Sequence, residues 1–306
     1  MRCLVTGASG HLGSYLTRLL QSRGHEVVAF VRPQSDLWRI SDVLPQTELI
    51  YGDMSDIDSV ETEIVSATPE TVFHLAWHGV SSEYRNDPNQ INYNLMGSLR
   101  LLQAAQKAGC NCWVGMGSQA EYGPYHGVLR EDLPTWPQTA YGVTKLCVGL
   151  LSRQLCEMAG LRYIWLRLLA AYGPKDDVHH LIPSVIVRLL ASEKPSLTLG
   201  EQRWDYLYVE DAAEAIYQVA LNPQAQGVFN LASGAAYTIR SIVERTRDIV
   251  DPRLPLGFGE VPYGPDQVMH MQADISKLQS TTGWTPKIEI DEGLRRTVEW
   301  YRNVQR

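Results

Sequence analysis

Tyr141 and Lys145 stand four residues apart, a spacing that puts a phenol and an ammonium group on one face of a helix. A tyrosine ordinarily ionises at a pH of about 10, and a nearby cation lowers that pKa, so such a pair can give or take a proton near neutrality. The pair follows an expected strand, 112–116, and Ser118, whose hydroxyl would lie at the carboxyl end of that strand. Because open parallel sheets bind ligands at that edge, we expect Ser118, Tyr141 and Lys145 to form a catalytic group.

Three glycines, Gly7, Gly10 and Gly13, follow the first expected strand and open a helix. Glycines at this spacing let the backbone turn tightly, approach a pyrophosphate and pack the helix onto the sheet. The N-terminus of the helix adds free N–H groups and a positive dipole end, which attract phosphates. The pattern predicts a dinucleotide-binding loop made of Gly7, Ser9, Gly10, His11, Leu12 and Gly13.

The residue type at the end of the second expected strand indicates whether NAD or NADP binds. NAD sites usually carry an acidic residue there, which binds the ribose 2′-hydroxyl. In this chain Arg32 follows the strand, and a guanidinium can pair with a 2′-phosphate. We therefore expect NADP(H), held with the help of Arg32 and Ser35. NAD(H) remains the alternative, because Asp36 lies only slightly further along the chain.

Short β-branched runs alternate with helical patterns through the first half of the chain. This alternation predicts βαβ units and a parallel sheet, and strands that are apolar throughout indicate a sheet covered on both faces. The expected strands are 2–6, 26–31, 48–51, 71–76, 112–116 and 162–167, and the expected helices are 12–23, 89–108 and 141–159.

The pattern loosens after Pro174. Short strands are expected at 197–199, 206–209 and 228–231, and helices at 181–191, 210–221, 238–250 and 291–301. We predict a doubly wound, Rossmann-type α/β domain over 1–173, to which 210–235 return. The remaining segments, 174–209 and 236–306, are predicted to form a smaller mixed α/β substrate-binding lobe.

Composition excludes several classes of protein. The 306 residues are 44% hydrophobic and 20% charged, as in ordinary globular proteins, and no apolar run is long enough to predict a membrane span. The net charge of -7 argues against nucleic-acid or membrane partners. Five cysteines without paired spacing predict neither disulfides nor a zinc site, and His179-His180 lacks a third ligand. With no leader segment recognisable at its start, the chain is expected to be cytoplasmic and free of metal.

Further sequence motifs, spread over nearly the whole chain, resemble those of a known protein family. Together with the three glycines, Ser118 and Tyr141-x-x-x-Lys145, they resemble the extended short-chain dehydrogenase/reductase family, and within it the NAD-dependent epimerase/dehydratase group that acts on nucleotide sugars. The segments that carry the resemblance are 52–54, 74–77, 94–98, 166–174, 204–211, 274–277 and 283–286.

The resemblance implies specific roles. Tyr141 would be the general acid/base, Lys145 would hold the nicotinamide ribose and lower the Tyr141 pKa, and Ser118 would bond to the oxygen at C4 of the sugar. Tyr141 and Lys145 would bind the cofactor together with Asp53, Met54, Leu75, Ala76, Trp77 and Asn94. The substrate would be a nucleotide sugar held by Ser118, Tyr141, His78, Val80, Gln119 and Arg203. The helices 89–108 and 141–159 would form a homodimer interface.

Departures from the family pattern limit which of the family's reactions the chain is expected to catalyse. The 4,6-dehydratases carry an acidic pair where this chain has Gln119 and Ala120, which disfavours dehydration. Glu121 is out of register with that pair and is expected to be a loop carboxylate. The 4-epimerases usually carry Asn, Arg and Arg, which bind the diphosphate, at the positions of Ala170, Trp204 and Gly264. Arg203, Arg188 or Lys175 would have to replace them.

The segment 117–123, taken with 74–77, is most similar to the branch that reduces NDP-4-keto-6-deoxyhexoses. The resulting expectation is an NADP(H)-dependent 4-ketoreductase, in which Tyr141 protonates the oxygen at C4 while Ser118 stabilises its charge. The main alternative is an NAD-dependent nucleotide-sugar epimerase. A reductase of a non-sugar carbonyl and a cofactor-sensing regulatory protein are further alternatives.

Overall fold

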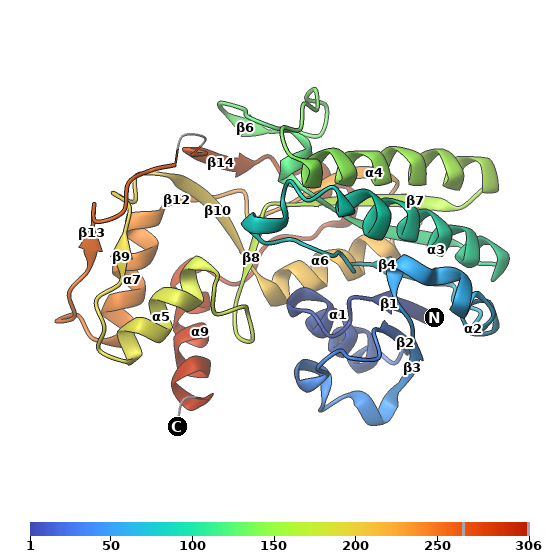
Figure 1. Cartoon of the computed structure of the whole chain (residues 1–306), viewed down its shortest axis with the longest axis horizontal. Coiled ribbons are helices and arrows are strands. Elements are labelled where there is room, and N and C mark those ends of the chain that lie inside the picture. The colour runs from blue at the N-terminus through green and yellow to red at the C-terminus, as the bar shows by residue number, and fades with distance from the viewer. Residues whose placement is uncertain (265–266, 305–306) are drawn as a thin grey trace.

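The computed structural model describes residues 1–264 and 267–304. Its main sheet has seven parallel strands in the order β11-β7-β5-β4-β1-β2-β3, which confirms the predicted doubly wound α/β class (Figure 1). The strands are β1 (Arg2–Thr6), β2 (Glu26–Val31), β3 (Thr47–Tyr51), β4 (Thr71–His74), β5 (Cys112–Ser118), β7 (Arg162–Leu168) and β11 (Gly227–Leu231). The order reverses between β1 and β4, so the carboxyl ends of these two strands flank a crevice suited to a ligand.

Alternation along the strands builds one hydrophobic core on each face of this sheet. In β1, Cys3 and Val5 belong to one core while Leu4 belongs to the other, and in β2 Val28 and Phe30 join Leu4. All these side chains are buried, as expected for a parallel sheet covered by helices on both faces.

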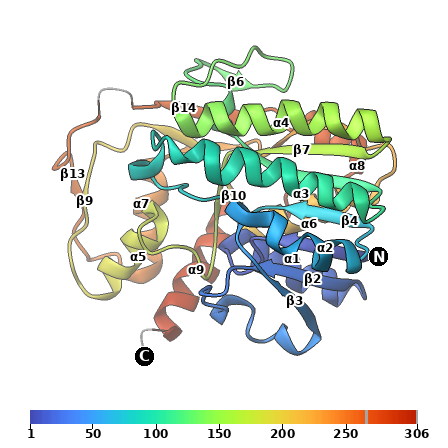
Figure 2. The same cartoon turned by 45° about the vertical axis from the view of Figure 1, so that its right-hand side comes forward.

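Helices cover the two faces as Figure 2 shows. The first core is closed by α1 (His11–Ser22) and α6 (Val209–Leu221), and the second by α2 (Glu61–Ser66), α3 (Met96–Lys107) and α4 (Ala140–Ala159). The helix predicted at 89–108 begins with a wider π turn, Gln90–Leu95, before α3. Within residues 1–264 and 267–304, no helix is both long and apolar enough to span a bilayer.

The smaller lobe is built on β10 (Arg203–Tyr208), which pairs with β8 (Ala170–Tyr172), β12 (Ala236–Thr238) and β14 (His270–Ala273). β14 also pairs with β6 (Val128–Leu129), and β9 (Ser196–Leu197) pairs with β13 (Gly257–Phe258). The lobe's helices are α5 (Leu181–Leu190), α7 (Ile239–Val250) and α9 (Ile290–Val304). In contrast, α8 (Ser276–Thr282) packs on β11 and α6, and its Leu278 belongs to the first core of the main sheet. Because β6 and β8 come from within 1–173, the small sheet joins the two predicted domains, and the division at residue 173 stays a prediction.

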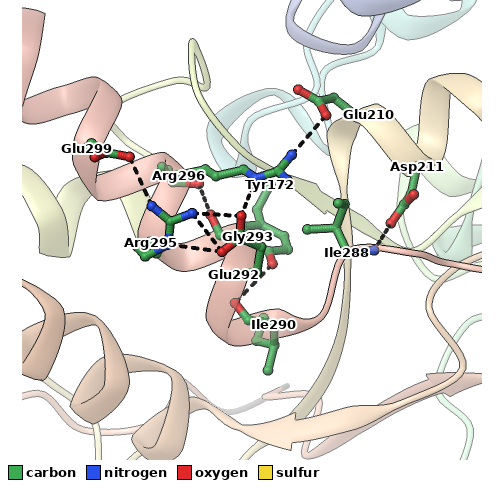
Figure 3. A network of polar contacts seen from close by, with 11 residues as sticks. Tyr172, Glu210, Asp211, Ile288, Ile290, Glu292, Gly293, Arg295, Arg296 and Glu299 are labelled. Atoms are coloured by element: carbon green, nitrogen blue, oxygen red, sulfur yellow. Dashed lines mark hydrogen bonds and ion pairs between the residues drawn. The ribbon is translucent and has the colours of Figure 1, made fainter.

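Figure 3 shows how the start of α9 is fixed against α6 and β8. The carboxylate of Asp211 accepts hydrogen bonds from the backbone N–H groups of Lys287 and Ile288, at 3.0 and 2.8 Å. A Cβ on Gly293 would lie 2.0 Å from the Tyr172 hydroxyl, so α9 can approach β8 this closely only with glycine at 293. The ion pairs of Arg295 and Arg296 with Glu292 are largely exposed and contribute little to stability.

Candidate active site

The loop between β1 and α1 has the geometry of a phosphate cradle. Gly7 has φ +73°, and a Cβ on Gly13 would lie 2.0 Å from the Gly7 carbonyl oxygen, so neither position accepts a larger residue without rearrangement. Within the part of the chain that the structure describes, no side chain caps the N-terminus of α1 and its first turn holds no acidic residue. The free N–H groups and the positive end of the helix dipole therefore face this loop.

A cavity of about 470 Å³ opens beside the loop, at the carboxyl ends of β1, β2 and β4. It brings together most of the predicted cofactor residues and one predicted substrate residue: Gly7, Ser9, Gly10, Arg32, Ser35, Asp53, Met54, Leu75, Ala76, Trp77 and His78. Phe30, Val31, Gly79 and Tyr93 also line it and were not predicted, although Phe30 and Val31 end β2 and the strand-edge rule points to them. Glycines that admit a pyrophosphate, beside a cavity of this volume at the carboxyl ends of three strands, fit a dinucleotide.

Six predicted cofactor residues lie outside the lining of this cavity: Tyr141 and Lys145, which are described below, and four others. The ring of His11 faces the smaller lobe, with its Nε2 3.1 Å from the Pro174 carbonyl oxygen and its Nδ1 3.2 Å from Asp176. Leu12 packs on the core, and Gly13 faces the carbonyl of Gly7. Helix periodicity explains this, because residues at the start of α1 point away from the phosphates that their backbone would bind.

Asn94 is the fourth of these residues, and its side chain is buried. Its amide accepts a hydrogen bond from the His78 N–H at 2.8 Å and donates to the His78 carbonyl at 3.0 Å. Asn94 thus positions the segment after β4, which lines the cavity, instead of facing the cavity itself.

Tyr141, Lys145 and Ser118 gather where this cavity meets α4 and β5. The Thr139 hydroxyl caps α4 by accepting from the Gly142 N–H, which places Tyr141 in the first turn of the helix. Lys145 Nζ donates to the Met116 carbonyl at 2.7 Å and lies 3.6 Å from the centre of the Trp77 ring. The ring centres of Trp77 and Tyr141 are 5.9 Å apart, so Trp77 connects the cavity with both residues.

Burial controls the charge of this pair. It raises the pKa of Tyr141 above its usual value, against the lowering effects of a hydrogen bond with Ser118 and of the nearby Arg85 charge. It also lowers the pKa of Lys145 to about 7. The Tyr141 pKa is therefore not lowered overall in this structure, because the desolvation of the phenol outweighs the nearby charges. The expected contribution of Lys145 to this pKa stays a prediction.

The expectation that Glu121 is a loop carboxylate is also wrong. Its side chain is buried and accepts hydrogen bonds from the Ser118 N–H at 2.8 Å and from Arg167 Nε at 2.8 Å. Ser118 in turn caps the short turn Gln119–Glu121, forming a capping box. The Ser-x-x-Glu spacing was a signal that could have predicted this arrangement.

A second cavity, of about 300 Å³, lies in the smaller lobe. Its lining is mostly apolar and aromatic: Leu181, Ser196, Leu197, Thr198, Gln202, Trp204, Tyr206, Ile239, Val261 and Gln267. Arg203 does not line this cavity, because adjacent residues of a strand point to opposite faces. Its guanidinium instead donates a hydrogen bond to the Ala236 carbonyl. Val80 is exposed, Gln119 is half-buried, and neither lines a cavity described here.

A model of the NAD dependent epimerase/dehydratase family matches residues 3–232. The chain belongs to this family. Among its family relatives, the UDP-glucose 4-epimerase of Corynebacterium glutamicum is 29% identical, over 94% of this chain and 91% of its own length. The dTDP-glucose 4,6-dehydratase of Streptomyces niveus is 27% identical, over 99% and 93%.

Solved structures agree with this family assignment. The UDP-glucose 4-epimerase of Thermotoga maritima, crystallised with UDP-glucose, has a TM-score of 0.91 and 26% identity, with each chain fully covered. The UDP-glucose 4-epimerase of Thermus thermophilus, in complex with NAD, has a TM-score of 0.89 and 25% identity, with 99% of each chain covered. This member of the epimerase/dehydratase family thus has the fold of extended short-chain dehydrogenase/reductase enzymes.

Proposed function

We propose that this chain is an NAD-dependent nucleotide-sugar 4-epimerase. The observation that carries the proposal is the position of Trp77, which lines the dinucleotide cavity and contacts both Lys145 and Tyr141. A proton-transferring phenol thus lies beside the cavity, near the hydroxyl of Ser118. The epimerase names of several relatives support this reaction over the predicted ketoreductase.

The residues of the chain supply the proton chemistry of such a reaction. A bound nicotinamide supplies hydride transfer at C4 of the sugar. Tyr141 would take the proton of the C4 hydroxyl and later return it. The hydride would likewise be returned to C4, so the reaction needs no net oxidant. Ser118 donates a hydrogen bond to the C4 oxygen and orients it. Lys145 stabilises the phenolate form of Tyr141 by its charge, since an adjacent cation favours the ionised phenol.

The segment after β5 argues against dehydration. Eliminating water from C5 and C6 requires an acid and a base beside the sugar. Gln119 and Ala120 offer neither, and the carboxylate of Glu121 is already bonded to Ser118, Trp165 and Arg167. The proposed reaction therefore stays at C4.

The cavity of the smaller lobe supports a substrate that carries a nucleotide, which this lobe would bind. Trp204 and Tyr206 lie with their ring centres 6.1 Å apart on the cavity-forming strand β10, and aromatic rings of this kind stack on bases. Trp204 stands where the family usually has a diphosphate-binding arginine, so base stacking would replace charge pairing at this position.

An NADP(H)-dependent 4-ketoreductase is the second candidate, and one observation favours it. Arg32 is exposed and lines the cavity together with Ser35 and Asp53. Its positive charge acts on Asp53, so it lies where a 2′-phosphate could be bound.

We also propose a homodimer formed through α3 and α4. Val143, Cys147, Leu150, Leu151 and Met158 share one face of α4, and Leu150 and Met158 are 50% and 78% exposed. Apolar stripes of this kind on a stable helix mark contact surfaces. Besides the cofactor and this second copy, a nucleotide sugar is the partner that the proposal names.

The test is to purify the protein, identify the nicotinamide that it retains, and incubate it with UDP-, dTDP-, GDP- and CDP-hexoses without added cofactor. Proton NMR of the anomeric signals reports the products. We expect retained NAD and formation of the C4 epimer of one substrate. If no hexose is converted, while NADPH is oxidised with an NDP-4-keto-6-deoxyhexose, the ketoreductase is correct and the epimerase is not.

A further inference from the structure

Glu121 is fully buried next to Ser118 of the proposed catalytic site. Its Oε1 accepts from the Ser118 N–H and from Trp165 Nε1, at 2.8 and 3.0 Å, and its Oε2 accepts from Arg167 Nε at 2.8 Å. Burying a charge is unfavourable unless it is paired and hydrogen-bonded, and here both conditions are met.

The surrounding chain leaves space for this carboxylate. A Cβ on Gly117 would lie 2.4 Å from Glu121 Oε1 and 2.4 Å from Trp165 Nε1. A Cβ on Gly115 would lie 2.4 Å from the Trp165 ring, and one on Gly149 of α4 would lie 2.9 Å from it. Two glycines of β5 and one of α4 thus accommodate Trp165 and Glu121, which a smaller apolar pair would not require.

Glu121 and Lys145 both form hydrogen bonds with the backbone at the carboxyl end of β5. Lys145 Nζ bonds to the Met116 carbonyl, and Glu121 bonds to the N–H of Ser118, two residues further along the strand. The negative charge of Glu121 raises the pKa of Lys145 against the lowering effect of burial.

Other titratable groups around Lys145 do not supply a negative charge. From β4, His74 has its pKa lowered by burial to about 3, so it is neutral at pH 7. From α4 comes Tyr141, whose pKa is raised, and from the segment after β4 comes Arg85, which is cationic. From β7 comes Arg167, which pairs with Glu121 itself. Within residues 1–264 and 267–304, Glu121 is therefore the carboxylate that acts on Lys145.

We infer that Glu121 is a positioning residue of the proposed site, which fixes the backbone of Ser118 and supplies the counter-charge that keeps Lys145 protonated. The inference rests on the proposed function, in which Ser118 and Lys145 serve the chemistry at C4. Glu121 thus acts through Ser118 and Lys145 and does not touch the substrate itself.

The variants are chosen to separate charge from structure. Glu121→Gln keeps an oxygen that can accept from Ser118 and removes the charge, but it leaves Arg167 buried without its partner. The double variant Glu121→Gln/Arg167→Met restores neutrality, and neutral replacements of buried ion pairs often fold as well as the original. Glu131→Gln is the matched control, because Glu131 also accepts a backbone N–H bond, from Asn230 at 2.7 Å, on a nearby segment.

The first readout does not depend on activity. Lysine labelled with ¹³C at Cε is incorporated, the Lys145 signal is assigned with Lys145→Met, and its chemical shift is followed against pH by NMR. We expect the midpoint of Lys145 to fall by about one pH unit or more in the double variant and to stay unchanged in Glu131→Gln. An unchanged midpoint in the double variant would overturn the inference.

The second readout is turnover against pH with the nucleotide sugar found in the test above. We expect kcat at neutral pH to fall by about tenfold or more in the double variant, with KM nearly unchanged and the low-pH side of the profile displaced. A merely structural role predicts that the double variant recovers wild-type turnover, which would overturn the inference. If Tyr141→Phe keeps full turnover, the proposed function itself fails, which is a distinguishable result.

Discussion

Tyr141 and Lys145 are buried together, and burial disfavours the charged form of each. The pKa of the phenol is raised and that of the ammonium is lowered to about 7. A site in this condition changes charge easily near neutral pH, since Lys145 is close to its titration midpoint. The low pKa therefore makes Lys145 sensitive to the charges around it, above all to that of Glu121.

Replacing Lys145 with methionine tests the cost of this buried charge. Below about pH 7 Lys145 is protonated in both the folded and the unfolded state, so its burial cost is fully present. Between pH 7 and its unfolded pKa of 10.5 the folded state loses the proton first, so wild-type stability rises with pH in this window. At about pH 6 we expect Lys145→Met to raise the free energy of unfolding by about 1–3 kcal/mol.

Denaturation by urea at about pH 6 and about pH 9 measures this effect, because the other titrating groups cancel in the comparison with wild type. The stability difference between the two proteins should shrink at the higher pH. A difference that is constant with pH would show that the ammonium bears no burial cost.

Spacing rules could predict Ser118, Tyr141 and Lys145, because a strand end and one helix turn fix their relative positions. They could not predict the role of Glu121, which depends on Trp165 and Arg167 from a strand more than 40 residues later. The charge state of Lys145 escaped prediction for the same reason, since it depends on complete burial among β4, β5 and α4.

At the scale of elements, the turn from β1 to α1 shapes the proposed dinucleotide site. The backbone carbonyl of Gly7 lies where a side chain of Gly13 would begin, and the backbone of Ala76 crosses Gly7 from β4. The loop at Gly7 is thus held closely between the first turn of α1 and the segment that follows β4.

Gly13→Ala should disrupt this contact. The new Cβ would meet the Gly7 carbonyl at 2.0 Å, so the helix must move, at a cost of about 1–3 kcal/mol in the free energy of unfolding. We expect the Kd for the nicotinamide dinucleotide, measured by calorimetry, to rise by about tenfold or more. Gly264→Ala is the control, because a Cβ there meets no atom of the described residues within 4 Å. Equal affinity in both variants would contradict the role of the turn.

The long, periodic elements could be predicted within one or two residues, as β2, α4 and α6 show. The short strands of the smaller sheet could not, because two or three residues carry no periodic signal and pair only in the finished fold. The π turn at Gln90–Leu95 was missed too, since Gln90 and Asn94 direct their amides to the segment after β4.

At the scale of the whole molecule, the two lobes meet at the phosphate loop. Asp176 is buried and accepts from His180 of the smaller lobe at 2.9 Å, while His11 of the loop lies 3.2 Å away. The Tyr301 hydroxyl of α9 donates to the Asp176 carbonyl at 2.7 Å. These contacts join the smaller lobe to the start of α1, so in the proposed enzyme they would connect the substrate lobe with the dinucleotide loop.

The exposed face of α4 gives the prediction for assembly. Leu150→Glu places a charge at the centre of the proposed dimer interface and should weaken the dimer by about 2 kcal/mol or more. Sedimentation of wild type should give twice the chain mass of 34.4 kDa, and Leu150→Glu should give one chain mass. Leu221→Arg, an exposed leucine at the end of α6, should leave the dimer intact. A wild-type monomer would contradict the proposed interface.

The account depends most on Tyr141 as the residue that moves the C4 proton. The most direct measurement compares wild type with Tyr141→Phe for conversion of a nucleotide hexose into its C4 epimer, followed by proton NMR without added cofactor. The account predicts a loss of turnover of about 100-fold or more in the variant, with the retained nicotinamide unchanged. Turnover by Tyr141→Phe at the wild-type rate would contradict it.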